Sequence, residues 1–239
     1  MSSSKMIVPK SNSPLAKIKV VNVKIRSYQS SDYDGCRKVF TEGMEQLISL
    51  VARVVLPKYC WILAALGVLV SLAAFMWTFW ILAFYTFLCV FMMAFLYVNI
   101  YIECWKFINS CLATDLKDIE KTYMSGNGSH MWVAEWEGKV VGMVGLVNNC
   151  SHKPRVAGLQ RMSVSTVCRG MGIAKKLLDE LCQHAKDQRF GKLVLTTTSA
   201  QIPAVRLYKK WGFNLIAVFP YPRMILGDLQ YLCFGLELK

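Results

Sequence analysis

The sequence predicts an α/β fold, a sandwich on a mixed β-sheet that is interrupted by an apolar membrane helical hairpin. Three observations support this fold class. Segments with the two-residue period of strands alternate with segments of helical spacing. Residues 59–102 contain no Asp, Glu, Lys or Arg. A loop with two glycines, at 169–174, lies where a predicted strand is followed by a predicted helix.

The composition indicates a membrane segment and an anionic partner. Hydrophobic residues make up 54% of the 239 residues, which is high for a soluble protein. Lysine and arginine outnumber aspartate and glutamate by 28 to 15, which suits a phosphate-rich ligand or an anionic membrane surface. The nine cysteines include no Cys-x-x-Cys pair, so we expect reduced thiols and no metal site. The basic residues are scattered, so no nucleic-acid partner is expected.

The chain is predicted to begin with a tail and the first part of the α/β domain. Residues 1–19 contain Ser, Pro and Lys without periodicity, so a disordered tail is expected. Apolar and polar residues alternate at 20–26, which predicts a strand. Apolar residues recur at helical spacing from 33 to 56, which predicts a helix. Residues 20–56 are therefore the predicted first strand and helix of the domain.

The uncharged stretch predicts a membrane hairpin at 57–105. One bilayer crossing needs about 20 apolar residues, so the stretch is too long for one helix and suits two, with a turn near Thr78. A single tilted span with an interfacial helix is an alternative. A buried helix of a soluble protein is disfavoured, because so long an uncharged run is hard to cover with protein. Arg53, Lys58 and Lys106 flank the run, which suits two cytoplasmic ends.

The remainder of the α/β domain is predicted at 106–239. Periodicity and turn residues predict helices at 115–124, from the glycine loop to 189, and at 202–211, and strands at 131–135, 140–147, 159–164, 192–197, 213–219 and 231–238. Gly191 and Gly212 are predicted to end the two later helices. A polar loop is expected at 148–155.

The glycine loop is suited to binding a phosphate. Glycine permits a tight turn and a close approach of the ligand to the backbone. The N-terminus of the following helix offers free N–H groups and the positive end of its dipole. Arg169 and Lys175 add positive charge nearby. We therefore expect the backbone from Gly170 to Lys175 to bind a pyrophosphate.

The loop resembles the acetyl-CoA loop of the GNAT superfamily of N-acetyltransferases, Arg/Gln-x-x-Gly-x-Gly/Ala, at Arg169, Gly172 and Ala174. The predicted order of elements is similar too, over 20–56 and 109–220. The apolar insertion resembles that of the membrane-bound camello-like branch, which includes cysteine-conjugate and aspartate N-acetyltransferases. The segments WVAEWEGKVVGMVG and RMSVSTVCRGMGIAK are similar to that branch as well. The resemblance implies a GNAT-type fold and acetyl-CoA as the acetyl donor.

A second GNAT signature is similar to residues 204–213, Ala-x-x-x-Tyr-x-x-x-Gly-Phe. That signature has an Asn three residues before the Ala, where this chain has Gln201. The resemblance implies that Tyr208 is the general acid for the departing CoA thiolate. A phenol with a pKa of about 10 is roughly matched to a thiol near 8.5. The alternative is a core tyrosine at helical spacing.

The resemblance also implies the cofactor contacts. Backbone groups of the strand before the loop pair with the pantetheine arm, as an added strand would. The implied cofactor-binding residues are Met162, Val164, Arg169, Gly170, Met171, Gly172, Ile173, Ala174 and Lys175.

The general base and the acceptor site are not evident. The strand segment at 156–161 contains no acid, which leaves Glu135, Glu42 or a chain of water molecules as candidates. Each carboxylate is otherwise a solvated or salt-bridged group. Strand alternation places Arg161 on the face opposite Met162, where it would hold an acceptor carboxylate through two hydrogen bonds. The alternative is an arginine paired with a nearby acid.

The sequence therefore predicts a membrane-bound enzyme that moves acetyl from acetyl-CoA to the amine of a small amino-acid-like acceptor, such as a cysteine S-conjugate. Two alternatives are a protein Nε-lysine acetyltransferase of the endoplasmic reticulum and a non-catalytic CoA-binding membrane scaffold. The expected partners are the small amine and the lipid bilayer. Acetyl-CoA is made in the cytosol, so we expect an endoplasmic reticulum membrane protein whose catalytic domain faces the cytosol. A glycan at Asn127 or Asn149, which fit Asn-x-Ser/Thr, would place that domain in the lumen.

Overall fold

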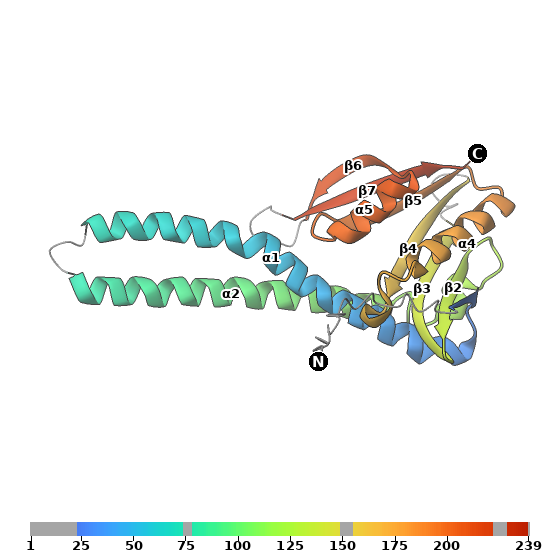
Figure 1. The fold of residues 1–239 in the computed structure, drawn as a ribbon, viewed down its shortest axis with the longest axis horizontal. Coiled ribbons are helices and arrows are strands. Elements are labelled where there is room, and N and C mark those ends of the chain that lie inside the picture. Colours follow the sequence, from blue (N-terminus) through green and yellow to red (C-terminus); the bar gives the residue numbers. More distant parts are fainter. Residues whose placement is uncertain (1–22, 74–77, 149–154, 222–228, 239) are drawn as a thin grey trace, which may run out of the picture.

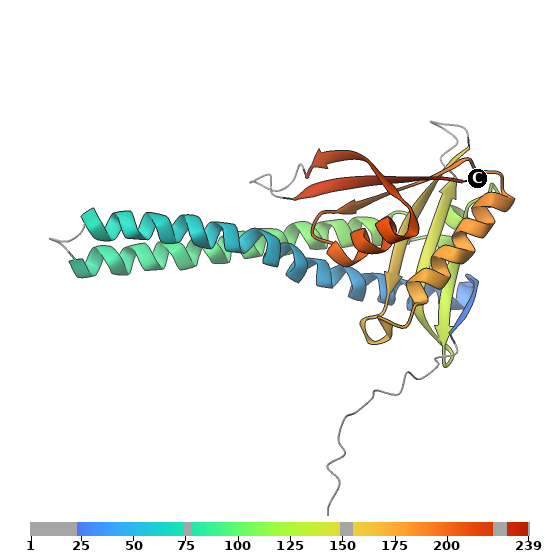
Figure 2. The ribbon, with the colours of Figure 1, turned by 45° about the horizontal axis from the view of Figure 1, so that its top comes forward.

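A helical hairpin extends from an α/β domain (Figure 1). The computed structural model describes residues 23–73, 78–148, 155–221 and 229–238. Two long helices, α1 (Tyr33–Ala73) and α2 (Thr78–Ala113), run side by side away from the sheet in both views (Figures 1 and 2). The predicted tail at 1–19, the turn between the long helices and most of the loop at 148–155 lie outside the described residues.

The α/β domain is built on one mixed sheet of seven strands in the order β1-β2-β3-β4-β5-β7-β6. Strands β4 and β5 are parallel, whereas the other neighbouring pairs in the described sheet are antiparallel. The predicted fold class is confirmed. The strands are β1 (Lys24–Ser27), β2 (His130–Trp136), β3 (Lys139–Asn148), β4 (Val156–Val164), β5 (Lys192–Thr198), β6 (Asn214–Pro220) and β7 (Gln230–Glu237).

Helices cover both faces of the sheet because successive strand residues point to opposite sides. Trp132 and Ala134 of β2 face one hydrophobic cluster, together with α4 (Ile173–Asp187) and α5 (Ile202–Trp211). Met131 and Val133 face a second cluster, together with α1, the end of α2 and α3 (Ile119–Tyr123). The hairpin helices are therefore continuous with one layer of the α/β sandwich.

Three helix boundaries differ from the predictions. Helix α1 continues without a break through Pro57, so the predicted start of the hairpin lies within one helix. The helix predicted at 115–124 shortens to α3, because α2 extends to Ala113 and the Asp118 side chain accepts the Lys121 N–H as a cap. Helix α4 ends at Asp187 and not at the predicted Arg189, because Arg189 takes a left-handed conformation, with φ of 57°, before Gly191 is reached.

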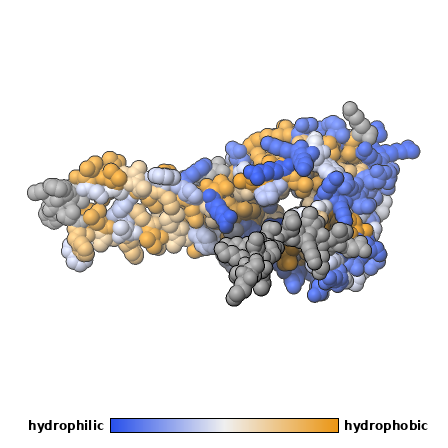
Figure 3. All heavy atoms as spheres, viewed as in Figure 1, coloured by the Kyte–Doolittle hydropathy of each residue, from blue (hydrophilic) through white to orange (hydrophobic). Residues whose placement is uncertain are grey.

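The outer part of the hairpin exposes its apolar side chains. Only 6% of the most apolar window of each long helix is buried in the structure. Trp61 is 78% exposed, Leu72 74% and Phe79 75%. The space-filling view shows this apolar surface along the hairpin, whereas hydrophilic residues gather on the α/β domain (Figure 3). By length and composition, both helices are able to cross a membrane.

A third hydrophobic cluster joins the base of the hairpin to the end of the sheet. Val51 and Ala52 of α1, with Cys104 of α2, pack against Ala200 and Leu229, which lie next to β5 and β7. This contact fixes the hairpin base against the end of the sheet at which β5 is followed by α5.

Candidate active site

Strands β4 and β5 separate partway along their length. Their register contains only three pairs, from Val156 with Lys192 to Gly158 with Val194. Among the described residues, 159–164 of β4 form no pairs with β5, which instead pairs with β7 along its whole length. An unpaired strand edge offers backbone N–H and C=O groups to an extended ligand. The opening therefore fits the predicted pairing of β4 with a pantetheine arm.

The glycine loop forms an open cradle beside this opening. Gly170 and Gly172 have φ of 78° and 75°, and a Cβ added to either would have no heavy atom within 4 Å. The first backbone hydrogen bond of α4 runs from Lys176 N to Gly172 O, at 3.1 Å. The backbone N–H groups of 173–175 therefore have no intrahelical acceptor. These donors fit the pyrophosphate of the implied cofactor.

Arg169 and Lys175, at the two ends of the cradle, are exposed, and Met171 is 41% exposed. Ile173 is buried beneath the loop and anchors the start of α4 in the core. The positive side chains thus stand in solvent beside the free N–H groups, where they would neutralise a phosphate.

Gly172→Ala is expected to raise the KM for acetyl-CoA about tenfold. The added methyl group strains a left-handed residue by about 1–2 kcal/mol and projects into the cradle. Gly126→Ala is the matched control, because Gly126 has φ of 76° and equally open surroundings in a loop that contacts the C-terminal part of α4, at His184, and not its start. Steady-state kinetics with varied acetyl-CoA measure the effect, and equal KM values in the two variants would contradict a cradle at Gly172.

Tyr208 lies at the core side of the opening. Its side chain is buried, and its hydroxyl donates to Met162 Sδ at 3.6 Å. Its ring packs edge-on against Phe213, with centroids 5.8 Å apart. Burial raises the pKa of Tyr208 above its ordinary value, so the phenol stays protonated throughout the physiological range. The structure thus brings together two predicted site residues, Tyr208 and Met162.

A bulge in β4 directs Arg161 away from Tyr208. Gly145 of β3 pairs with Gln160 and Met143 pairs with Ser163, so two residues of β4 oppose one of β3. Arg161 stands at this bulge with φ of 52°. Ser163 Oγ donates to the Val39 carbonyl of α1 at 3.0 Å. The predicted alternation is confirmed, because Arg161 and Ser163 face the α1 layer and Met162 faces Tyr208.

Asp115 holds the Arg161 guanidinium by two hydrogen bonds. Arg161 Nε and Nη2 donate to the two carboxylate oxygens, each at 2.7 Å. Tyr123 donates a third bond to Asp115 Oδ2 at 2.6 Å. Burial opposes ionisation of Asp115, but the bonds from Arg161 and Tyr123 outweigh it and lower its pKa. An acceptor carboxylate would have to displace Asp115 to meet this edge of the guanidinium.

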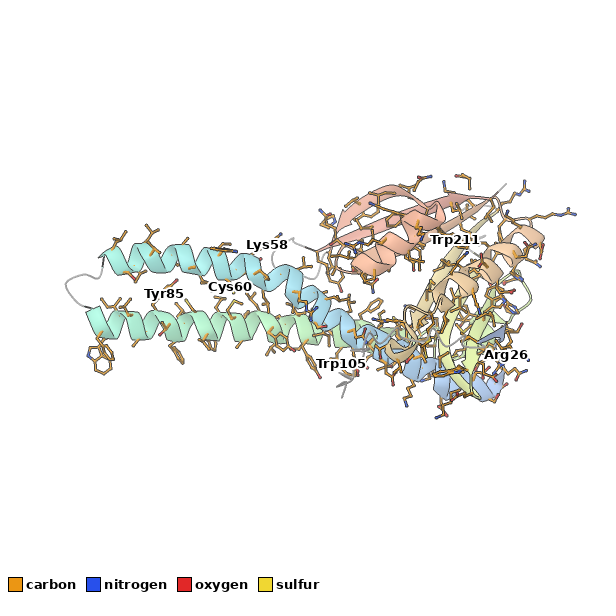
Figure 4. The ribbon with its side chains drawn as sticks, in the orientation of Figure 1. Arg26, Lys58, Cys60, Tyr85, Trp105 and Trp211 are labelled. Carbon is orange, nitrogen blue, oxygen red and sulfur yellow. The ribbon has the colours of Figure 1, made fainter. Side chains whose placement is uncertain are left out.

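The two predicted candidates for the general base lie in different places. Glu135 accepts a hydrogen bond from Arg26 Nε at 2.6 Å on the outer strands β1 and β2, and Arg26 lies at the end of the domain away from the hairpin (Figure 4). The structure does not bring Glu135 to Tyr208. Glu42 is 42% exposed on α1 and lies 4.0 Å from Lys38 Nζ. Its neighbour Gly43 contacts Ser163 of β4.

The sequence did not indicate that Asp115, Tyr123 or the bulge in β4 belongs to the site. Asp115 stands among charged residues at the end of an apolar helix, which in sequence is typical of a solvated turn. Only the fold brings it to Arg161, 46 residues away. The run Leu-Gln-Arg-Met-Ser-Val at 159–164 contains no glycine that would have indicated a bulge.

Comparisons with known proteins agree with this geometry. Residues 96–213 match the family described as acetyltransferase (GNAT) family. N-acetyltransferase 8F1 of Mus musculus is 38% identical over 193 residues, which cover 80% of this chain and 85% of that protein. N-acetylaspartate synthetase of Xenopus tropicalis is 33% identical, over 90% of this chain and 79% of that protein.

A solved structure extends the likeness to the fold. An acetyltransferase of the GNAT family from Staphylococcus aureus Mu50 superposes with a TM-score of 0.56, at 18% identity, over 91% of this chain and 99% of that chain. The GNAT signatures at the cradle and at Tyr208, the family match and the relatives over most of the chain lead to one conclusion. The chain belongs to the GNAT family, among relatives of the N-acetyltransferase 8 type, and is an acetyl-CoA-dependent N-acetyltransferase.

Proposed function

We propose that this chain is a membrane-bound enzyme that transfers the acetyl group directly to the amine of a small amino-acid-like acceptor, such as a cysteine S-conjugate, with Tyr208 as general acid. The observation that carries the proposal is the position of the buried Tyr208 hydroxyl, on Met162 at the unpaired edge of β4. The likeness to a relative named N-acetylaspartate synthetase supports an amino-acid-like acceptor.

The proposed roles of the residues follow from their positions. The N–H groups at the start of α4 bind the pyrophosphate of acetyl-CoA, and the backbone of Met162 and Val164 positions its pantetheine arm. Tyr208 holds a proton that it gives to the departing thiolate. The phenol is protonated at neutral pH, as a general acid must be. Burial raises its pKa further and so makes it a weaker acid than an exposed phenol.

The hairpin is proposed to anchor the enzyme in a bilayer. The α/β domain includes β1 and the start of α1 before the hairpin and all later strands after it. Both ends of the hairpin therefore lie on the same side of a membrane, which requires an even number of crossings. The apolar, exposed surfaces of α1 and α2 suit two crossings. We place the catalytic domain on the cytosolic face of the endoplasmic reticulum, where acetyl-CoA is available.

A parallel acceptor assay tests the proposed function. The full chain in detergent or lipid discs is given acetyl-CoA with a cysteine S-conjugate, aspartate or a lysine peptide, and release of free CoA thiol is measured. Thiol release with the amino-acid-like acceptors supports the proposal. Release with the lysine peptide alone would indicate a protein acetyltransferase. Protein that binds CoA but releases no thiol with any acceptor would indicate a membrane scaffold.

A further inference from the structure

Two polar side chains, Glu103 and Thr198, each have a buried oxygen without a hydrogen-bond partner among the described residues. Glu103 of α2 accepts a hydrogen bond from Lys106 Nζ through Oε1, at 2.7 Å. Its second carboxylate oxygen, Oε2, is buried and has no hydrogen-bond partner among the described residues. Thr198 Oγ1, at the end of β5, is equally buried and unpaired within the described chain. A buried polar atom without a partner is unfavourable, so each of these oxygens is available to a ligand.

Tyr221 and Tyr231 connect these two groups. Tyr231 of β7 is the cross-strand partner of Thr198. Its ring lies 4.8 Å from that of Tyr221, centroid to centroid. Burial and Tyr231, with a smaller contribution from Glu103, raise the pKa of Tyr221. Tyr221 also packs on the cluster that contains Cys104, the residue next to Glu103. Glu103 on α2 and Thr198 on β5 therefore border the same pair of tyrosines.

The face of α2 that carries Glu103 also lies near Arg161 and Met162 of β4. Phe107 lies one helical turn after Glu103, and residues at this spacing share a helix face. The Arg161 guanidinium lies 5.9 Å from the Phe107 ring centroid. Arg161 immediately precedes Met162, whose sulfur contacts the Tyr208 hydroxyl. Glu103 thus stands on the α1–α2 side of the opening between β4 and β5, and Tyr208 on the opposite side.

A third buried atom without a hydrogen-bond partner among the described residues is Trp105 Nε1, and its ring packs against the same cluster as Tyr221. Trp105 lies two residues after Glu103, about 200° around the helix. Its ring packs beside Tyr101, with centroids 6.1 Å apart. The indole N–H is a donor only, so unlike the Glu103 and Thr198 oxygens it cannot accept a hydrogen bond from an ammonium group.

We propose that Glu103 is the general base of the reaction and that Glu103 and Thr198 together bind the acceptor's ammonium group. This assignment rests on the proposed transfer to a small amine. The free Glu103 oxygen accepts one ammonium proton, and the Thr198 hydroxyl accepts a hydrogen bond from another. This residue pair needs two N–H donors, which a primary or a secondary ammonium group offers and a tertiary one does not.

The proton balance of the step is complete with these residues. One proton passes from the ammonium to Glu103 and then to solvent. The nitrogen lone pair forms the N–C bond to the acetyl carbon while the C–S bond breaks. Tyr208 gives its proton to the departing thiolate, and the remaining excess proton on nitrogen restores the Tyr208 phenol through solvent. The net products are the N-acetyl amide, free CoA thiol and one released proton.

Glu103→Gln tests the base, with the full chain in lipid discs. We expect kcat to fall roughly 10²–10⁴-fold while the binding of acetyl-CoA is unchanged. Glu103→Asp should recover part of kcat. The loss should shrink for an acceptor whose amine carries an electron-withdrawing neighbour and is largely unprotonated at the assay pH, because that amine needs no base. Glu45→Gln, an exposed acid on α1, is the control and should keep the original kcat.

The outcomes separate this inference from the proposed function. If Glu103→Gln keeps kcat while Tyr208→Phe loses it, the base assignment is wrong and the proposed transfer stands. If Glu42→Gln instead shows the loss that is relieved by the unprotonated amine, Glu42 is the base and Glu103 is not. An equal loss of kcat in Glu103→Gln with the protonated and the unprotonated amine would show that Glu103 has a structural role only. Wild-type protein that acetylates no amine would remove the proposed function and the inference with it.

Thr198→Val tests the second ligand of the ammonium, because valine keeps the shape and removes the hydroxyl. The KM for the acceptor should rise several-fold, and the KM for acetyl-CoA should not change. Thr196→Val is the matched control, because Thr196 lies two residues earlier on the same strand, is exposed and has a hydrogen-bond partner in Cys233. An acceptor KM in Thr198→Val equal to that of the control would exclude Thr198 from the site.

Discussion

Tyr208→Phe is expected to lower kcat roughly 10²–10⁴-fold, the usual contribution of a positioned general acid. The change removes one oxygen, whose hydrogen bond among the described residues is a weak one, to Met162 Sδ at 3.6 Å. The ring contacts with Phe213 and Phe234 are kept, so the free energy of unfolding should change by less than about 1 kcal/mol. The KM for acetyl-CoA should stay within a few-fold of the wild-type value. Thiol release at saturating acetyl-CoA measures kcat.

Tyr28→Phe provides the comparison for this experiment. Tyr28 and Tyr208 are both 6% exposed, but Tyr28 lies in the cluster between the sheet and α1, away from the opening. Removing its hydroxyl should leave kcat unchanged. A wild-type kcat in Tyr208→Phe would show that solvent protonates the thiolate. Tyr208 would then contribute only to the packing of the core.

Arg161→Gln is expected to lower the free energy of unfolding by about 3–5 kcal/mol, because it leaves the buried Asp115 carboxylate without its ionic partner. The side chains are 19% and 13% exposed, so solvent does little to compensate. The double variant Arg161→Gln, Asp115→Asn should regain much of the loss. Lys192→Gln removes a cation at 2.6 Å from Glu237, which is 70% exposed, and should cost less than about 1 kcal/mol. Chemical denaturation measures all three.

The stabilisation by this ion pair depends on pH with a definite sign. The pKa of Asp115 is lower in the folded chain than its ordinary value. Its contribution is therefore present above a pH of about 4 and is lost as the pH falls through the folded pKa. The double variant should lack this acid-dependent part. If the effect of Arg161→Gln on unfolding is no larger than that of Lys192→Gln, the pair does not hold β4 against the turn at Asp115.

Kinetics of Arg161→Gln also decide between the two predicted roles of Arg161. A clamp on an acceptor carboxylate predicts a raised KM for a carboxylated acceptor and an unchanged KM for its amide. A structural partner of Asp115 predicts the same change for both acceptors. The bidentate contact with Asp115 leads us to expect the second result.

Local patterns in the sequence were enough to predict the elements and the glycine loop at the start of α4. Helix α5 has its predicted bounds, because the apolar spacing and Gly212, with φ of 99°, act over a few neighbouring residues. The same holds for the cradle, where glycines at strand-to-helix spacing determine the backbone directly. The uncharged run predicted two long apolar helices because the absence of charge is a property of composition. The end of α4 was predicted less well, since Arg189 takes the left-handed position for which glycine is usual.

The remaining features of the site depend on contacts between residues distant in sequence. The sequence by itself determined the elements, the glycine cradle, the apolar hairpin and the candidacy of Tyr208. The tertiary structure decided that β4 and β5 separate after Gly158, that Arg161 meets Asp115, and that Glu103 and Thr198 border the same pair of tyrosines. Such pairings are set by strand register and by the packing of whole helices. A residue's own neighbours in sequence carry no record of them, because the free energy that fixes them comes from burial across the fold.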